Sequence, residues 1–295
     1  MSTPAPGEPG WQPRLVALDI DGTLLRWITG AGTTHEEVPD AVRAAVRRAA
    51  RAGAHVVLAS GRSPHSMTGV ADLLGLAELA DDRLWIVASN GAVVTRYPPL
   101  EVVREETFDA GPAVQRILQL HPEALVAVEE RGVGYRVNRA FPTGELSGDL
   151  IPTPVEHMVA APVSRVIIRD PAATVDDFVR LGAELGLHGT DYVVGWTAWL
   201  DLSAPGVSKA SGLDHVADAL GLTAADALAI GDGRNDVEML RWAGRGVAMG
   251  QAVDVVHQAA DAVTDGVDDD GAARELERWF GTGTTAGITG DTTGG

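Results

Sequence analysis

Two carboxylates follow a strongly apolar run in residues 15–25, which read LVALDIDGTLL. The run predicts a buried strand, and side chains that follow such a strand in an open α/β sheet lie in the crevice where ligands bind. Asp19 and Asp21 would repel each other there, so the pair requires a divalent cation or a shared proton. Gly22 allows a tight turn out of the strand, and the Thr23 hydroxyl can hold that turn. Acidic pairs also follow strands as solvated loops or helix caps, so this pair alone does not decide the function.

Two further apolar runs also end in polar residues. Ser60 closes a strand predicted at 55–59, and Asp232 follows a strand predicted at 227–230. Three predicted strands therefore carry ligand-type side chains at their carboxyl ends. Lys209 is the only lysine of the chain, because every other Lys/Arg position is arginine. This single compact ammonium indicates a position at which a planar guanidinium would fail, and the alternative is that the lone lysine is an accident of composition.

Taken together, these motifs resemble those of the haloacid dehalogenase-like hydrolase superfamily. They are DIDGT at 19–23, SGR at 60–62, Lys209 and GDGRND at 231–236. Their order and spacing, with SNGA at 89–92, resemble the Cof-type phosphatases of that superfamily, which carry a large type IIB cap after the third core strand. The resemblance covers residues 14–280 and implies an α/β fold, with a Rossmann-like parallel-sheet core and an inserted α+β cap over the cleft.

The resemblance also implies roles for individual residues. Asp19 is the nucleophile that accepts the phosphoryl group, and Asp21 is the acid/base that protonates the leaving oxygen and later activates water. A hydrolytic dehalogenase would not need Asp21, so the second aspartate favours phosphate chemistry. The residues implied for phosphate binding are Ser60, Gly61, Arg62, Lys209 and Asn235. Those implied for Mg²⁺ are Asp19, Asp21 through its backbone carbonyl, Asp232, and Asp236 either directly or through water.

Strand-like and helical segments alternate up to residue 91 and again from residue 209. This alternation predicts right-handed βαβ units and a parallel sheet. Turn residues cluster near Gly91 and at 203–206, which places the core domain at 14–91 and 204–280 and the cap at 92–203. The tails, 1–13 and 281–295, are rich in Pro, Gly, Thr and Ser, and we expect them to be disordered.

The middle of the chain has many predicted strands and few helices, as an α+β module would. The strands are expected at 93–97, 102–107, 125–129, 134–138, 165–169, 192–194 and 199–202. Helices are expected at 113–120 and 175–185.

Composition restricts the classes of function. The net charge of −18 disfavours a nucleic-acid partner, because phosphate backbones require a basic surface. The absence of cysteine excludes disulfides, thiolate zinc sites and cysteine nucleophiles. No signal peptide is visible, and no apolar run approaches the roughly eighteen residues of a membrane helix. We expect a cytoplasmic monomer or small homo-oligomer without nucleic-acid or membrane partners.

These observations predict a magnesium-dependent phosphatase that hydrolyses a small phosphorylated metabolite, a sugar phosphate by default, through an aspartyl phosphate. A bound cation with Lys209 and Arg62 would reverse the local potential of the acidic chain in the cleft. Two alternatives stay open: a phosphomutase or phosphotransferase with the same capped fold, and a non-catalytic member that only binds its ligand. The intact motifs argue against the non-catalytic alternative.

Overall fold

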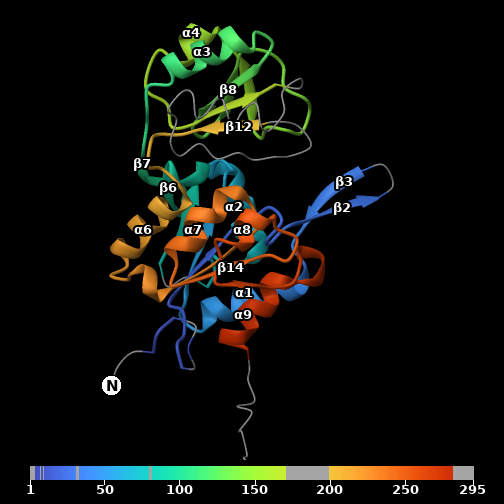
Figure 1. Cartoon of the computed structure of the whole chain (residues 1–295), viewed down its shortest axis with the longest axis vertical. Helices are drawn as coiled ribbons and strands as arrows, with labels where there is room; N and C mark the ends of the chain where they lie inside the picture. The colour runs from blue at the N-terminus through green and yellow to red at the C-terminus, as the bar shows by residue number, and fades with distance from the viewer. Residues whose placement is uncertain are drawn as a thin grey trace, which may run out of the picture.

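The largest element of the structure is a sheet of eight strands, with a second sheet of five strands beyond one end of it (Figure 1). The computed structural model describes residues 4–6, 8, 10–30, 33–79, 82–170 and 199–281. The strands of the large sheet are β1 (Leu15–Leu18), β4 (His55–Ala59), β5 (Leu84–Ala88), β6 (Val93–Tyr97), β7 (Glu101–Glu105), β13 (Ala227–Gly231), β14 (Arg245–Ala248) and β15 (Ala262–Val263). They lie in the order β15-β14-β13-β1-β4-β5-β6-β7.

Six strands of this sheet, from β15 to β5, pair in parallel. Their carboxyl ends therefore lie along one edge, as the alternating sequence pattern predicts. β6 and β7 continue the sheet in antiparallel pairing. From the sequence we expect these two strands in the cap, but their hydrogen bonds place them in the large sheet. A strand pattern does not tell which sheet a strand joins, and the short turn η1 (Ser89–Gly91) folds β6 back onto β5.

Helices cover both faces of the large sheet, so its central strands are buried on both sides. Val16 and Leu18 pack with α1 (Asp40–Arg51), α2 (Pro64–Leu74) and α9 (Gly271–Phe280). Leu15 and Ala17, which alternate with them, pack with α6 (Lys209–Ala219), α7 (Val237–Trp242) and α8 (Asp254–His257). This period of two is the strand period, and the resulting three layers are those of a doubly wound α/β fold.

Among the described residues, the helices that pack on the second sheet cover one of its faces. Its strands are β8 (Leu125–Glu130), β9 (Gly134–Val137), β10 (Asp149–Pro152), β11 (Val166–Arg169) and β12 (Trp199–Leu202), in the order β10-β9-β8-β11-β12. The helices α3 (Gly111–Leu120) and α4 (Val155–Met158) cover the face away from the large sheet (Figure 1). The predicted helix 175–185 and strand 192–194 lie outside the described residues. The predicted α/β fold with an added α+β module is confirmed, whereas the exact domain limits stay a prediction.

A two-stranded hairpin, β2 (Arg26–Gly30) and β3 (Thr33–Glu37), extends from the large-sheet part of the molecule (Figure 1). The pattern of residues 26–37 does not indicate this hairpin. Short 3₁₀ turns complete the described chain: η2 (Ala224–Asp226), η3 (Arg234–Asp236) and η4 (Val267–Asp269). None of the described helices has the length and apolar character needed to cross a lipid bilayer. The tail beyond residue 281 lies outside the described residues.

Candidate active site

The polar residues that follow four neighbouring strands meet at the carboxyl edge of the large sheet. Asp19 follows β1, Ser60 follows β4, Asn90 lies just beyond β5, and Asp232 follows β13. Backbone hydrogen bonds extend the pairing into these residues, from the Asp19 N–H to the Ile230 carbonyl and from the Ser60 N–H to the Val87 carbonyl, both at 3.0 Å. The strand ends therefore hold these side chains in a fixed arrangement.

Lys209 lies at the centre of this arrangement and is fully buried. It is the first residue of α6, whose N-terminus is capped by the side chain of Ser208. Its Nζ donates to Asp19 Oδ1 at 2.7 Å and to Asp236 Oδ1 at 2.6 Å. Burial alone would lower the pKa of Lys209, but the two carboxylates outweigh burial and raise its pKa above the ordinary value. The lone lysine of the sequence is therefore a charged ammonium that joins β1 to the loop after β13.

Three carboxylates gather around this ammonium. One oxygen each of Asp19, Asp232 and Asp236 lies within 4.8 Å of the others. Burial, and next the charge of Asp236, raise the pKa of Asp19 well above its ordinary value, although Lys209 opposes them. Burial and the same neighbour raise the pKa of Asp232 to about 6. One ammonium therefore does not balance the negative charge of the cluster.

The residues around the cluster fit a divalent cation. Carboxylate and carbonyl oxygens are the ligands that hard cations prefer. The loop with Gly22 packs so closely on Asp232 that a side chain at Gly22 would collide with that carboxylate, and its φ of 76° suits glycine. Gln251 fixes this contact, since its Nε2 donates to the Gly22 carbonyl at 2.6 Å and to Asp232 Oδ2 at 3.1 Å. The three carboxylates could thus hold a metal ion.

Asp236 uses both carboxylate oxygens within the protein. Oδ1 accepts from Lys209, and Oδ2 accepts from the backbone N–H groups of Asp232 at 2.9 Å and Gly233 at 2.8 Å. These bonds fix the loop after β13 and the ammonium together. Direct ligation of a metal by Asp236, and ligation through water, both stay predictions.

Asp21 is not part of the three-carboxylate cluster. Its carboxylate forms a bidentate ion pair with Arg62, from Nε to Oδ2 at 2.9 Å and from Nη2 to Oδ1 at 2.5 Å. In this structure the guanidinium of Arg62 holds the predicted acid/base, and its contact with phosphate stays a prediction. The predicted metal ligand is the backbone carbonyl of Asp21, and that assignment stays a prediction.

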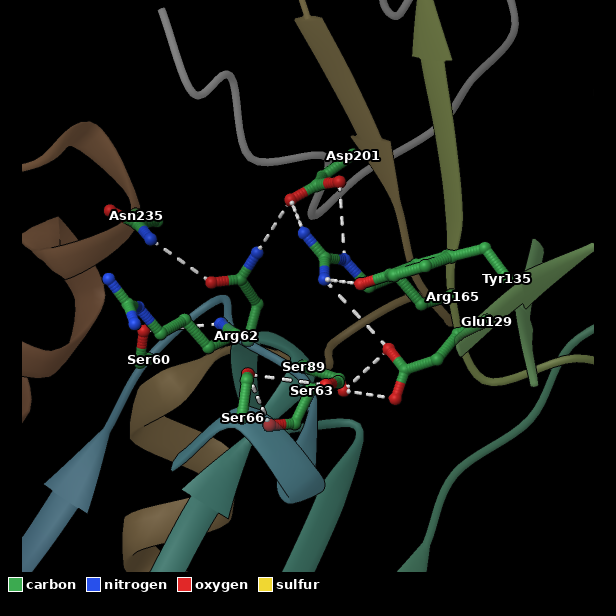
Figure 2. Close-up of polar contacts among 11 residues, drawn as sticks. Ser60, Arg62, Ser63, Ser66, Ser89, Glu129, Tyr135, Arg165, Asp201 and Asn235 are labelled. Carbon is green, nitrogen blue, oxygen red and sulfur yellow. Dashed lines mark hydrogen bonds and ion pairs between the residues drawn. The ribbon is translucent and has the colours of Figure 1, made fainter. Parts of the chain in front are cut away.

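The remaining residues predicted to bind phosphate lie around Asn90. Asn235 Nδ2 donates to Asn90 Oδ1 at 3.0 Å, and a Cβ at Gly61 would lie 3.1 Å from the same oxygen. Ser60 is buried, and its Oγ accepts from the Arg62 backbone N–H at 3.1 Å (Figure 2). The structure thus brings Ser60, Gly61 and Asn235 to one side of the site.

Sequence reasoning missed two residues of this site, Asn90 and Gln251. Both follow parallel strands, β5 and β14, so the strand-end signal that indicates Asp19 and Asp232 was present for them too. The expectation that the Thr23 hydroxyl holds the turn after β1 is wrong. This hydroxyl is buried and has no hydrogen-bond partner within the described part of the chain. Backbone bonds to the Ile20 carbonyl hold that turn instead.

A family model provides the observation that decides what kind of protein this is. The model of haloacid dehalogenase-like hydrolases matches residues 16–138 and 159–276. The chain belongs to the haloacid dehalogenase-like hydrolase family. The predicted membership of this superfamily is thereby confirmed.

The curated relatives of this hydrolase include proteins named as phosphatases. A phosphoglycolate phosphatase of Natronomonas pharaonis is 34% identical over 265 residues, which cover 89% of this chain and 96% of the relative. The 5-amino-6-(5-phospho-D-ribitylamino)uracil phosphatase YcsE of Bacillus subtilis is 26% identical, with 90% of this chain and 95% of the relative covered.

Solved structures match the fold over nearly their whole length. The phosphatase BT1666 of Bacteroides thetaiotaomicron matches with a TM-score of 0.70 at 26% identity, over 91% of this chain and 95% of that chain. The subclass IIB sugar phosphatase BT4131 matches with a TM-score of 0.73 at 23% identity, over 90% and 98%. The cap arrangement of the hydrolase is therefore of the predicted Cof type.

The raised pKa of Asp232 predicts how the stability of the metal-free hydrolase depends on pH. Its pKa is about 6 in the folded chain, against an ordinary value of 3.8. The folded state thus binds the proton more tightly, so this residue's effect on the free energy of unfolding becomes less favourable as pH rises from about 4 to about 6. Asp232→Asn removes that loss and should stabilise the metal-free chain at pH 7.5 by about 3 kcal/mol.

Urea unfolding in a chelator, at pH 3.5 and pH 7.5, measures this difference. At pH 3.5 the wild-type carboxyl is protonated, so the variant and the wild type should differ little. An equal gain at both pH values would show a packing effect and contradict the prediction. A divalent cation at pH 7.5 should raise the stability of the wild type more than that of Asp232→Asn.

Proposed function

We propose that this hydrolase is a magnesium-dependent phosphatase that cleaves a small phosphorylated metabolite, a sugar phosphate by preference, through an aspartyl phosphate. The observation that carries the proposal is the buried ammonium of Lys209 between Asp19 and Asp236, beside Asp232. This arrangement provides a nucleophile, a fixed cation and a set of oxygen ligands within one site. The phosphatase names of the curated relatives support the proposal.

Asp19 is the nucleophile of the proposed reaction. Lys209 binds its Oδ1, which leaves Oδ2 to attack the phosphorus atom of the substrate. The P–O bond to the leaving group breaks as the O–P bond to Asp19 forms, and the ammonium stabilises the charge on the phosphoryl oxygens. A magnesium ion at Asp19, Asp232 and the Asp21 carbonyl would add positive charge at the same oxygens.

Asp21 handles the protons of the proposed reaction. It donates a proton to the leaving oxygen and then takes one from the water that hydrolyses the aspartyl phosphate. Arg62 holds its carboxylate in one orientation at the edge of the site, where the side chain of Asp21 is 40% exposed. Arg62 therefore orients the acid/base Asp21 in the proposed reaction, in addition to its predicted contact with phosphate.

The names of the relatives support small polar leaving groups. Those relatives act, by name, on phosphoglycolate and on a phosphorylated ribityl compound, and one matching fold is that of a sugar phosphatase. A panel of phosphorylated metabolites with magnesium, alongside p-nitrophenyl phosphate, tests the proposal by release of inorganic phosphate. Turnover should stop in a chelator and return with magnesium. Failure to hydrolyse any phosphomonoester, or full turnover after exhaustive chelation, would contradict it.

The nucleophile is tested by Asp19→Asn. The amide still accepts a hydrogen bond from Lys209 and fits the same space, so the fold should stay intact. Turnover should fall by a factor of about a thousand or more, because an amide cannot form the acyl phosphate. Steady-state kinetics with p-nitrophenyl phosphate and thermal unfolding measure the two effects separately. Turnover within tenfold of the wild type would rule out the covalent mechanism.

The lone lysine is tested by Lys209→Arg. The ammonium fills a fully buried space against two carboxylates, which a larger planar guanidinium cannot enter without displacing one of them. We expect a loss of roughly tenfold or more in kcat, since misplaced charge stabilisation commonly costs about a hundredfold. Arg241→Lys, an exposed position on α7, is the matched control and should not change turnover. Equal turnover of Lys209→Arg and the wild type would contradict the assigned role.

A further inference from the structure

On the face of the second sheet opposite α3 and α4, a triad of buried charged residues lies outside the site described above: Glu129, Arg165 and Asp201, each less than 9% exposed. Arg165 donates to Asp201 from Nε to Oδ1 at 3.2 Å and from Nη2 to Oδ2 at 2.7 Å. Its Nη1 lies 3.8 Å from Glu129 Oε2 and 3.3 Å from the Tyr135 hydroxyl. These side chains point away from α3 and α4, toward the carboxyl edge of the large sheet (Figure 2).

The two carboxylates of this triad bind two consecutive residues of the large-sheet part. Ser89 Oγ donates to Glu129 at 2.8 and 3.0 Å, and Asn90 Nδ2 donates to Asp201 Oδ2 at 3.1 Å. Both residues have left-handed backbone conformations, with φ of 49° and 53°. Residues other than glycine keep a left-handed backbone conformation only when the surrounding structure fixes it. The second sheet thus fixes the turn that follows β5.

Asn90 passes this contact on to the active site. Its Oδ1 accepts from Asn235 Nδ2 at 3.0 Å, and Asn235 directly precedes Asp236. A carboxylate can only accept hydrogen bonds, so the side chain of Asn90 must direct its NH₂ group toward Asp201. The amide oxygen of Asn90 must then face Asn235, which in turn must present its own NH₂ group. The charge of Asp201 therefore sets the direction of the whole chain of bonds.

We propose that Asp201 is a positioning residue that acts through Asn90 to fix the side-chain amide of Asn235 in the active site. The inference rests on the proposed function and on the predicted role of Asn235 as a phosphate-binding residue. Direct contact of Asp201 with substrate is disfavoured, because the side chain is buried and both of its oxygens already accept bonds from Arg165 and Asn90.

The isosteric change Asp201→Asn tests the direction of the bonds. An amide at 201 offers a single accepting oxygen to Arg165 and Asn90 together, so the bond that orients Asn90 is weakened or reversed, and Asn235 loses its fixed orientation with it. We expect kcat to fall by about tenfold, a usual effect of disturbing residues that orient an active-site group. The loss should be the same for p-nitrophenyl phosphate and for a hexose phosphate. A loss confined to the hexose phosphate would make Asp201 a substrate contact and overturn the proposal.

Glu129→Gln is the matched control. It removes the same charge from the same triad, but its partner Ser89 has a hydroxyl that both donates and accepts, so no direction is passed to Asn235. Its kcat should stay within about twofold of the wild type. Equal losses in the two variants would show that the triad matters only for stability, and would overturn the proposal.

A double-mutant cycle with Asn235→Ala isolates the connection. If Asp201 acts through Asn235, then Asp201→Asn should lower kcat no further in the Asn235→Ala background. Additive losses, or wild-type turnover of Asn235→Ala, would overturn the proposal.

The side-chain amide resonances of Asn235 provide a readout without turnover, and they should shift in Asp201→Asn but not in Glu129→Gln. A wild-type chain that hydrolyses no phosphomonoester would contradict the proposed function alone, since these resonances still test the coupling.

Discussion

The buried contact of Lys209 with Asp19 and Asp236 is the interaction on which the rest of the site depends. The three residues come from the end of β1, from the start of α6 and from the loop after β13, and Lys209 lies 190 positions along the chain from the Asp19 that it binds. A buried charge is tolerated only when it is paired and hydrogen-bonded, so the fold must bring both carboxylates to the same point. The parallel strand order does this, because β1 and β13 are neighbours whose ends lie side by side. The pairing of β1 with β13 therefore both builds the core of the sheet and brings together the carboxylates that Lys209 binds.

The charge of this site also explains how an acidic chain can hold a phosphate group. Three carboxylates face one ammonium, and the pKa values of Asp19 and Asp232 are raised because burial and Asp236 disfavour their charged forms. A divalent cation would remove that conflict, and its charge would then act with Lys209 on the same oxygens. The net charge of −18 concerns the whole surface, whereas a ligand in the cleft responds to the few charges nearest to it. Surface acidity and phosphate binding are therefore compatible.

The sequence predicts the part of the site that follows a local rule. An apolar run that ends in a polar residue indicates the end of a parallel strand, and this rule locates Asp19, Ser60 and Asp232. It does not show which sheet a strand joins, which is why β6 and β7 were expected in the cap although they pair with β5. This rule also does not predict hydrogen bonds or ion pairs between side chains of different loops. The ion pair of Arg62 with Asp21 needs the tertiary structure, because both residues are plausible partners for other groups in the sequence.

The buried triad of the second sheet shows a further limit of sequence reasoning. Glu129, Arg165 and Asp201 lie on one face because each alternates with apolar residues that pack on α3 and α4, yet their approach depends on the register of β8, β11 and β12. The two branches of the triad differ in one physical respect. A hydroxyl adapts to a donor or an acceptor, so the bond of Ser89 to Glu129 fixes position only. An amide facing a carboxylate has one allowed orientation, so the bond of Asn90 to Asp201 fixes direction as well. The branch through Asn90 continues through side-chain amides to Asn235, and it is the branch that carries this directional constraint.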